Sequence, residues 1–284
     1  MKHFFWLLWT MPALGFAQGL AKSSPYDSAR YSWRKAVPRN RLRELQPYRP
    51  GVTENPFTVD AGHLQVEMDA LRLTNSGAGA DERQRYWQLG YSVIKLGLSR
   101  RTAVQMELPL YNVQKELPRT EPQPEERRAG FGDVSLRVKH NFLGDAQDGS
   151  FGMAAIGYVR LPTGGLVGSG GAEYGLIVPV DIELSDNSNL EAQLATGLNY
   201  DREQARRYLQ LVPSVALEYD FTEKTGLIAE TVAQWDAQQR RWQPSFNLAP
   251  ILKLTENLQL DAGISLALNR LTDQQYFAGF TLRR

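Results

Sequence analysis

The chain contains no cysteine and little histidine. Without cysteine, disulfide bridges, thiolate metal sites and cysteine nucleophiles are excluded. A cysteine-free chain also suits the oxidising periplasm. Three histidines, His3, His63 and His140, are spread over 284 residues, so a serine hydrolase would have few bases available to activate its nucleophile. We see no metal-ligand spacing, and we expect neither a metal nor a cofactor.

An excess of charge of one sign is also missing. The chain has 32 Lys and Arg against 31 Asp and Glu, which gives no overall argument for binding nucleic acid. Beyond the N-terminus no stretch approaches the ~18 consecutive apolar residues of a transmembrane helix. We therefore expect no transmembrane helix in the mature chain.

The N-terminus has the features of a secretory signal peptide. A short basic start, Lys2 and His3, precedes an apolar run that ends near Phe16. Small residues, Gly15 and Ala17, occupy the positions of an A-x-A-like cleavage site. The run is too short to span a bilayer. We predict a signal peptide over residues 1–17, removed after Ala17, and secretion across the inner membrane of a Gram-negative cell.

Residues 18–58 differ in composition from the rest of the chain. Between Gln18 and Phe57 there are eight Lys or Arg against three Asp or Glu, a net charge of +5. No period of 2 or 3.6 persists, so we expect a basic, flexible segment in the periplasm. An alternative is that the segment plugs a barrel or contacts anionic lipid headgroups.

From residue 62 onward, apolar residues alternate with polar or small ones. Val134, Leu136 and Val138, for example, fall on one face of a strand, whereas Arg137 and Lys139 fall on the other. A helix cannot sort residues this way, because its period is 3.6. Turn residues separate twelve such segments, at residues 62–73, 85–98, 102–112, 131–143, 150–161, 173–185, 189–200, 207–221, 225–235, 241–255, 257–270 and 275–284.

This pattern predicts an all-β fold, an antiparallel up-and-down transmembrane β-barrel over residues 59–284. Twelve is an even number, as in bacterial outer-membrane barrels, and a tilted strand of ~11 residues spans roughly the ~25 Å apolar band. Odd-numbered connections are the longer ones, which puts both termini in the periplasm. Pro179, Pro213, Pro244 and Pro250 fall inside predicted strands, where they weaken the register.

The polar face of the first strands predicts the lining of a lumen. A soluble barrel would also alternate, but with its apolar face inside. The signal peptide, strand length and loop asymmetry favour lipid outside. We expect Glu107 to form an ion pair with Arg137 or Lys139. The predicted lumen-lining residues are Gln65, Glu67, Asp69, Gln105, Glu107, Arg137, Lys139, Asn141, Asp181 and Glu183.

Four stretches of the chain resemble a known family of outer-membrane transporters. The stretches are residues 54–69 ("ENPFTVDAGHLQVEMD"), 130–144 ("GFGDVSLRVKHNFLG"), 159–171 ("VRLPTGGLVGSGG") and the end, "YFAGFTLRR". In their order and spacing they resemble the family named after the meta-cleavage pathway of phenol degradation. The resemblance covers residues 54–284 and implies passage of small, often hydrophobic or aromatic, compounds. One departure is that the last strand continues past Phe280 into "TLRR", whereas such strands usually end in an aromatic residue.

Three functions are compatible with these observations. A channel or transporter is favoured, because twelve strands leave room for a lumen. A structural or partner-binding barrel without transport is the alternative. A lipid hydrolase is disfavoured, because His140 falls on the apolar face and lacks a serine two residues on. The expected partners are outer-membrane lipid and lipopolysaccharide, a small solute and the barrel-assembly machinery, and no nucleic acid.

Overall fold

The computed structural model describes residues 30–80, 82–118, 125–144, 150–238 and 240–284. The predicted signal peptide, residues 1–17, lies outside these ranges, as do residues 18–29 of the basic segment. A short 3₁₀ helix, η2 (Arg39–Arg41), precedes the strands. In the described ranges, no helix is long and apolar enough to cross a membrane.

The chain from residue 64 onward folds into one antiparallel sheet of 13 strands. Their bounds are close to those expected from the alternation, because period-2 patterning fixes which residues share a face. The strands are β1 (Leu64–Asn75), β2 (Glu82–Gly97), β3 (Thr102–Pro118), β4 (Glu126–Gly130), β5 (Val134–Leu143), β6 (Phe151–Leu161), β7 (Glu173–Ser185), β8 (Ser188–Asp201), β9 (Arg206–Thr222), β10 (Thr225–Asp236), β11 (Arg241–Thr255), β12 (Leu258–Ala267) and β13 (Gln274–Arg283).

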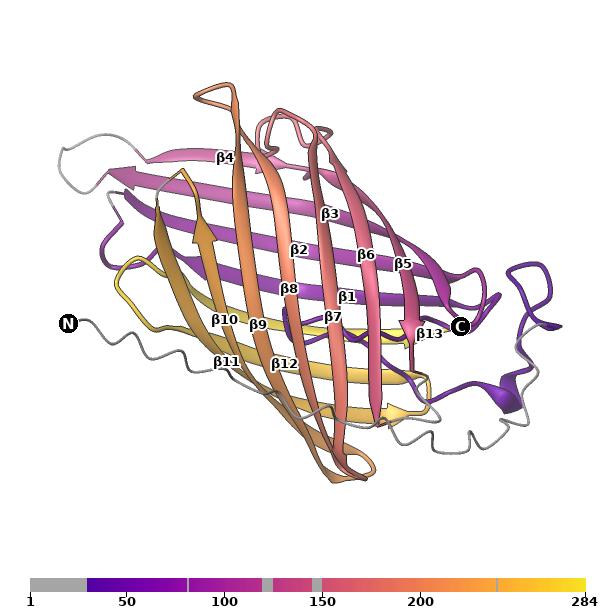
Figure 1. The fold of residues 1–284 in the computed structure, drawn as a ribbon. Helices are drawn as coiled ribbons and strands as arrows, with labels where there is room; N and C mark the ends of the chain where they lie inside the picture. Colours follow the sequence, from indigo (N-terminus) through magenta and orange to yellow (C-terminus); the bar gives the residue numbers. More distant parts are fainter. Residues whose placement is uncertain (1–29, 81, 119–124, 145–149, 239) are drawn as a thin grey trace, which may run out of the picture.

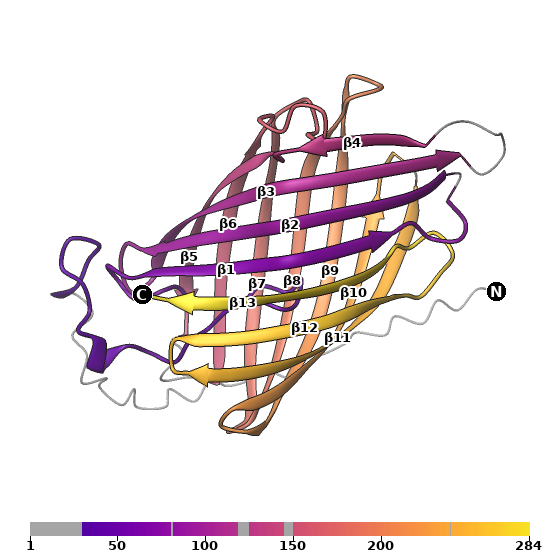
Figure 2. The same cartoon turned by 180° about the vertical axis from the view of Figure 1, so that it is seen from behind.

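The sheet closes into a barrel. Strands that follow one another in sequence pair with each other, except β4 and β5, and β1 pairs with both β2 and β13, so the first and last strands lie side by side (Figures 1 and 2). β4 and β5 both pair with β3, at different heights. They therefore share one position in the ring, and the barrel has twelve strand positions. The predicted all-β barrel with twelve strands is confirmed.

The connection between the third and fourth predicted strands differs from the expectation. We expected a long loop over residues 113–130. Instead β3 continues to Pro118, and β4 pairs with it from Asn112↔Gly130 to Glu116↔Glu126. This rim hairpin was missed because its outward residues are charged, so the apolar alternation stops although the backbone pairing continues.

The barrel has two different ends. Short connections, such as residues 186–187, 223–224 and 256–257, lie at one end, together with the start of β1 and the end of β13. We call this the turn end. The longer connections, such as residues 162–172 and 268–273, lie at the other, the loop end. Because strands alternate in direction, this asymmetry follows the alternation of connection lengths in the sequence.

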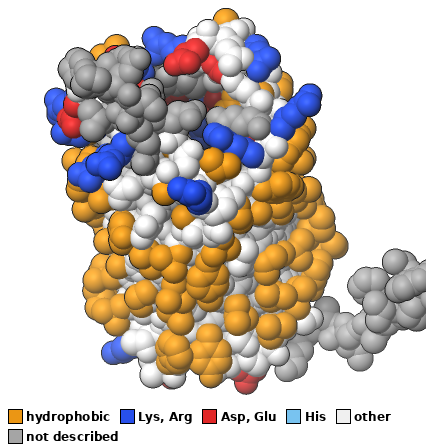
Figure 3. Space-filling view, turned by 90° about the vertical axis from the view of Figure 1, so that its left-hand side faces the viewer, with side chains coloured by type: hydrophobic (Ala, Val, Ile, Leu, Met, Phe, Trp, Pro, Cys, Tyr) orange, Lys and Arg blue, Asp and Glu red, His pale blue; other side chains and the backbone are white. Residues whose placement is uncertain are grey.

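The burial pattern is inverted relative to a soluble barrel. Arg137 and Lys139 are 6% and 1% exposed, whereas Leu136 and Val138 between and beside them are 46% and 52% exposed. The same alternation runs along the other strands. Figure 3 shows the resulting belt of hydrophobic side chains on the face of the barrel turned to the viewer. Polar residues fill the inside and apolar residues cover the outside, as lipid-facing barrels require.

Three of the four strand prolines coincide with gaps in the backbone pairing. Pairing of β9 with β10 skips from Ser214 to Leu211, around Pro213. Pairing of β6 with β7 skips the region of Pro179, and pairing of β11 with β12 skips Pro250. Proline lacks the N–H that a ladder bond needs. The ring nevertheless keeps one register on either side of each gap.

Candidate functional site

A segment that precedes the first strand lies inside the barrel. Residues 43–60, called the plug loop from here on, carry almost fully buried side chains at Arg49, Thr53 and Glu54. The two ends of the loop meet at the turn end, where Arg43 Nε donates to Asp60 Oδ1 over 2.8 Å. Between them the chain runs into the barrel and returns (Figure 1). For residues 43–58 this differs from the expected solvated segment and matches the plug arrangement.

Arg49 ties the plug loop to two strands at once. Its guanidinium forms an ion pair with Asp69 on β1, and its Nη2 lies 2.5 Å from Asp261 Oδ1 on β12. Arg49 is 3% exposed. A buried arginine needs such partners, because an unpaired charge in the interior costs several kcal/mol, on the order of 3–5. The planar fork of arginine allows it to bridge two carboxylates.

Glu54 ties the other arm of the loop to β5. Its carboxylate pairs with Arg137 and lies 3.1 Å from Lys139 Nζ. Lys139 Nζ also donates to the carbonyl oxygen of Asn55 over 2.7 Å. Burial alone would raise the pKa of Glu54, but Arg137 and Lys139 lower it well below its usual value. The carboxylate therefore stays ionised, and it satisfies two buried cations of the wall.

Glu230 on β10 binds the tip of the loop. It accepts hydrogen bonds from the backbone N–H groups of Val52 (2.9 Å) and Thr53 (2.5 Å) and from the Thr53 hydroxyl (2.5 Å). Gln193 on β8 accepts from Glu54 N over 2.9 Å and donates to Val52 O over 3.0 Å. The tip is thus held by strands on the side of the barrel opposite to β1 and β2.

The base of the plug is held by the end of the last strand. Arg283 Nη1 donates to the carbonyl oxygen of Arg43 over 2.8 Å and lies 3.5 Å from Asp60 Oδ2. Leu282, in contrast, faces outward and is 43% exposed. The residues of "TLRR" therefore keep the alternation of β13 and its pairing with β1 and β12, and Arg283 has a structural role.

The structure places nine of the ten predicted lumen residues in the interior. Gln65, Glu67, Asp69, Gln105, Glu107, Arg137, Lys139, Asn141 and Asp181 are all 8% exposed or less. Glu183, two residues beyond Asp181 on β7, is exposed at the turn end. Glu107 Oε1 lies 2.5 Å from Arg137 Nη1, one of the two pairs expected for it, whereas Lys139 pairs with Glu54. That these side chains line a path for solute remains a prediction.

The interior position of several residues is not apparent from the sequence pattern. Lys95 pairs with Glu67 and lies 4.5 Å from the centre of the Tyr48 ring. Arg49 and Glu54 belong to a basic segment without a period, so no alternation places them in the interior. Their one signal was the position of Glu54 at the start of the family-like stretch. Contacts between segments far apart in sequence cannot be read from alternation.

One side of the interior has carboxylates without cation partners. Asp181 on β7 lies directly opposite Glu191 on β8, and the two are 3% and 8% exposed. Glu218 on β9 is nearby, opposite Asn189. With the residues that the structure describes, none of these three carboxylates forms an ion pair or a side-chain hydrogen bond. The β7–β9 side is therefore acidic and uncompensated.

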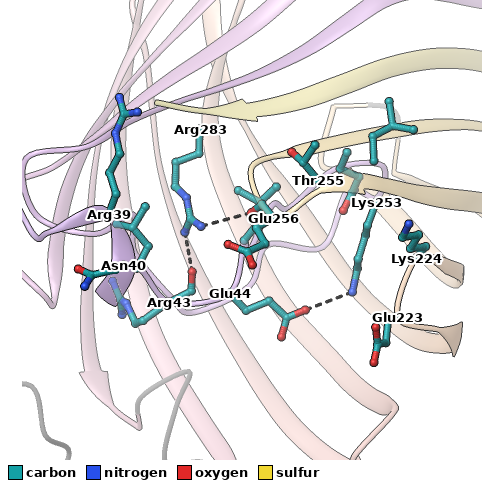
Figure 4. Close-up of a pocket in the computed structure, with 14 residues that line it drawn as sticks. Arg39, Asn40, Arg43, Glu44, Glu223, Lys224, Lys253, Thr255, Glu256 and Arg283 are labelled. Carbon is teal, nitrogen blue, oxygen red and sulfur yellow. Dashed lines mark hydrogen bonds and ion pairs between the residues drawn. The ribbon is translucent and has the colours of Figure 1, made fainter.

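Open space at the turn end lies on the same side. A cavity of about 780 Å³ separates the base of the plug loop, including Arg43 and Glu44, from the β9–β10 and β11–β12 turns. Figure 4 shows Lys253 reaching Glu44 across it. A smaller cavity of about 80 Å³, lined by Glu44, Lys253 and Glu218 among others, adjoins it near the β7–β8 turn. At the turn end, space thus remains between the base of the plug loop and β8–β12, whereas the tip contacts β8 and β10 directly.

At the loop end, Asp133 organises the glycine-rich connection over residues 162–172. Its carboxylate accepts from Gly164 N and Ser169 N, both at 2.7 Å. A Cβ on Gly168 would lie 2.4 Å from Asp133 Oδ1, so the close approach requires glycine there. Because Asp133 follows the β4–β5 interruption, it links the rim hairpin to the next loop.

Comparisons with known proteins agree with this architecture. A model of the family described as "MetA-pathway of phenol degradation" matches residues 48–283. An outer membrane channel from Pseudomonas putida F1 superposes with a TM-score of 0.58 at 11% identity, covering 85% of this chain and 100% of that one. The translocator domain of the autotransporter NalP from Neisseria meningitidis reaches 0.50 at 10% identity, covering 84% and 90%. A comparison with curated proteins finds no match.

Proposed function

The chain belongs to the family described as "MetA-pathway of phenol degradation", and we propose that it is an outer-membrane channel for small hydrophobic or aromatic compounds, closed here by its plug loop. The observation that carries the proposal is the inverted barrel whose polar interior holds residues 43–60, bound to wall residues such as Arg137 and Glu230. A twelve-strand barrel encloses a lumen, and a removable segment inside it acts as a gate.

The orientation and location belong to the same proposal. With the turn end in the periplasm, the long connections face outward, as in outer-membrane barrels. Secretion would use a signal peptide over residues 1–17, and insertion would use the barrel-assembly machinery. Phospholipid and lipopolysaccharide would then surround the apolar belt of Figure 3.

The route past the plug loop runs along β7–β12 in this proposal. The cavities of about 780 and 80 Å³ lie on that side, whereas the Arg49 and Glu54 anchors hold the loop to β1, β12 and β5. A solute that enters from the loop end would reach the periplasm there once the tip detaches from Glu230. The predicted lumen residues would line the wall of this path.

The arrangement of the histidines does not favour a lipid hydrolase. His63 contacts two backbone carbonyls, of Val37 (2.7 Å) and Arg284 (3.3 Å). His140 contacts the Thr102 hydroxyl at 3.0 Å on the outer face of the barrel. A nucleophile–base pair requires a hydroxyl held beside a base and an oriented third group. His63 contacts only carbonyls, and His140 has the Thr102 hydroxyl but no third group among the residues that the structure describes.

Planar-bilayer recordings test the proposal. Full-length protein should show brief, small openings, and proteoliposomes should take up a small aromatic solute faster than empty vesicles. A protein that migrates differently when boiled and unboiled, yet gives neither conductance nor uptake, would favour a structural or partner-binding barrel.

A further inference from the structure

On the β2–β4 side, the outer face of the barrel changes from apolar to basic within one residue row. Trp87, Val113 and Ala129 lie directly opposite one another on β2, β3 and β4. The next outward row toward the loop end is Arg85↔Lys115↔Arg127. Three cations on three adjacent strands thus border the apolar belt. Figure 3 shows basic side chains gathered above the hydrophobic belt at this end.

The height of this row matches a membrane surface. On β2 the outward apolar residues run from Leu96 near the turn end to Trp87, opposite Leu64 and Leu73 of β1. Nine steps of ~3.3 Å, tilted by ~40°, give roughly 23 Å, close to the ~25 Å apolar band of outer-membrane barrels. The Arg85–Lys115–Arg127 row therefore falls at the level of lipid headgroups.

The row lacks enough negative charge of its own. Like charges directly opposite on neighbouring strands repel. Lys115 Nζ lies 2.7 Å from Glu125, and Arg85 Nε donates to the neutral Asn75 side chain over 3.3 Å. Arg127 is exposed, and no residue that the structure describes forms an ion pair with it. Two guanidinium groups are left to bind an external anion.

The other side of the rim provides a contrast. There Arg207, on β9 next to the belt, donates to the Ala172 carbonyl and lies over the rings of Tyr174 and Tyr200, 5.2 and 5.7 Å from their centres. These contacts within the chain satisfy the guanidinium of Arg207. The basic row on β2–β4 therefore differs from this arginine, whose charge is satisfied within the chain.

We propose that Arg85, Lys115 and Arg127 form a binding site for the phosphate groups of lipid A, the phosphorylated glycolipid of the outer leaflet. The inference rests on the proposed orientation in the outer membrane. Guanidinium forks match phosphate oxygens in pairs, and acyl chains of the same lipid would lie on Trp87, Leu89 and Tyr111 below the row. Charge complementarity and height above the belt together select this occupant.

Lipid A binding to the full chain tests the site, with neighbouring arginines as a matched pair. Arg127→Gln removes an arginine of the row. Arg128→Gln removes the next residue on β4, which faces the other way and pairs with Glu126 at 3.1 Å. Both variants lose one positive charge. Native mass spectrometry in detergent should show binding of bisphosphorylated lipid A weakened roughly fivefold by Arg127→Gln and unchanged by Arg128→Gln. Arg85→Gln/Arg127→Gln should weaken it further.

Three outcomes would overturn the proposal: equal binding by the two single variants, equal binding of dephosphorylated lipid A, or full competition by millimolar inorganic phosphate. The last would indicate a general anion site. Heat-modifiable migration confirms folding of each variant, and Arg85→Gln alone replaces Arg127→Gln if β4 is disturbed. Conductance is recorded separately, so loss of channel activity with intact lipid A binding would refute the channel proposal and leave this site standing.

Discussion

The two sides of the barrel interior handle charge in opposite ways. On the side formed by β1, β2 and β5, each buried charge has a partner: Arg49 with Asp69, Lys95 with Glu67, and Glu54 with Arg137. On β7–β9, Asp181 and Glu191 lie directly opposite each other, and no cation among the described residues forms an ion pair with either. The paired side seats the plug loop, and the acidic side borders the open space. The loop is therefore fixed by buried ion pairs on one side, whereas the other side holds only its tip, through hydrogen bonds to Gln193 and Glu230, so that this flank is able to open.

Removing the plug loop should have the largest effect. Deletion of residues 18–60 takes away Arg49, Glu54 and the tip, while the β1–β13 pairing that closes the ring remains. Single-channel conductance should rise severalfold. The shorter deletion of residues 18–36, which keeps the whole loop, is the control. Equal conductance of the two deletions would mean that the loop does not gate the lumen.

Loss of a single ion-pair anchor on the paired side should lower the stability of the barrel. Glu54→Gln leaves Arg137 and Lys139 buried with less compensation, and the free energy of unfolding should fall by about 3–5 kcal/mol. Glu44→Gln changes an exposed acid of the same loop, 67% exposed and 3.3 Å from Lys253, and should cost less than about 1 kcal/mol. Thermal unfolding in detergent measures both, and similar values would contradict the asymmetry.

The Glu54 anchor also has a defined pH dependence. Its folded pKa is lowered below the ordinary value of 4.5 by Arg137 and Lys139. Its contribution to stability is therefore present above pH ~4.5 and is lost only as the pH falls through the lowered value. Conductance of the full chain should stay low between pH 7 and 5. Opening already at pH 5 would show that another group controls the plug.

A Glu→Gln substitution on the acidic side should change the free energy of unfolding in the opposite direction. Glu191→Gln removes a carboxylate that lies directly opposite Asp181, and like charges in that position are destabilising. Unfolding free energy should rise by about 0.5–1 kcal/mol. A decrease comparable to that of Glu54→Gln would mean that Glu191 has a cation partner after all, and the two sides would then be equivalent.

The smallest effect is expected at the end of the acidic side. Glu183 shares a face with Asp181 but is exposed at the turn end. Glu183→Gln should change stability by less than about 0.5 kcal/mol and leave conductance unaltered. A conductance change there would extend the lumen path to the tip of β7 and restore Glu183 as a lining residue.

The strands were largely predictable because their signal is local. Alternation along residues such as Val134 to Asn141 needs only the period of the strand and the choice of face. The rim hairpin was missed where Lys115 and Arg127 break the apolar series, although the backbone still pairs. The interior position of Asp69 and Arg137 followed from the same alternation. Their partners Arg49 and Glu54 did not, because no local pattern links residues so distant along the chain.

By itself, the sequence determined the twelve-strand barrel, its polar and apolar faces and the difference between its two ends. Each of these depends on the side-chain period or on connection length, which are properties of neighbouring residues. Only the tertiary structure decided that the basic segment before β1 enters the barrel. That outcome depends on carboxylates and cations of β1, β5, β10 and β12 converging in space, because buried charges are stable only where partners from other strands meet them.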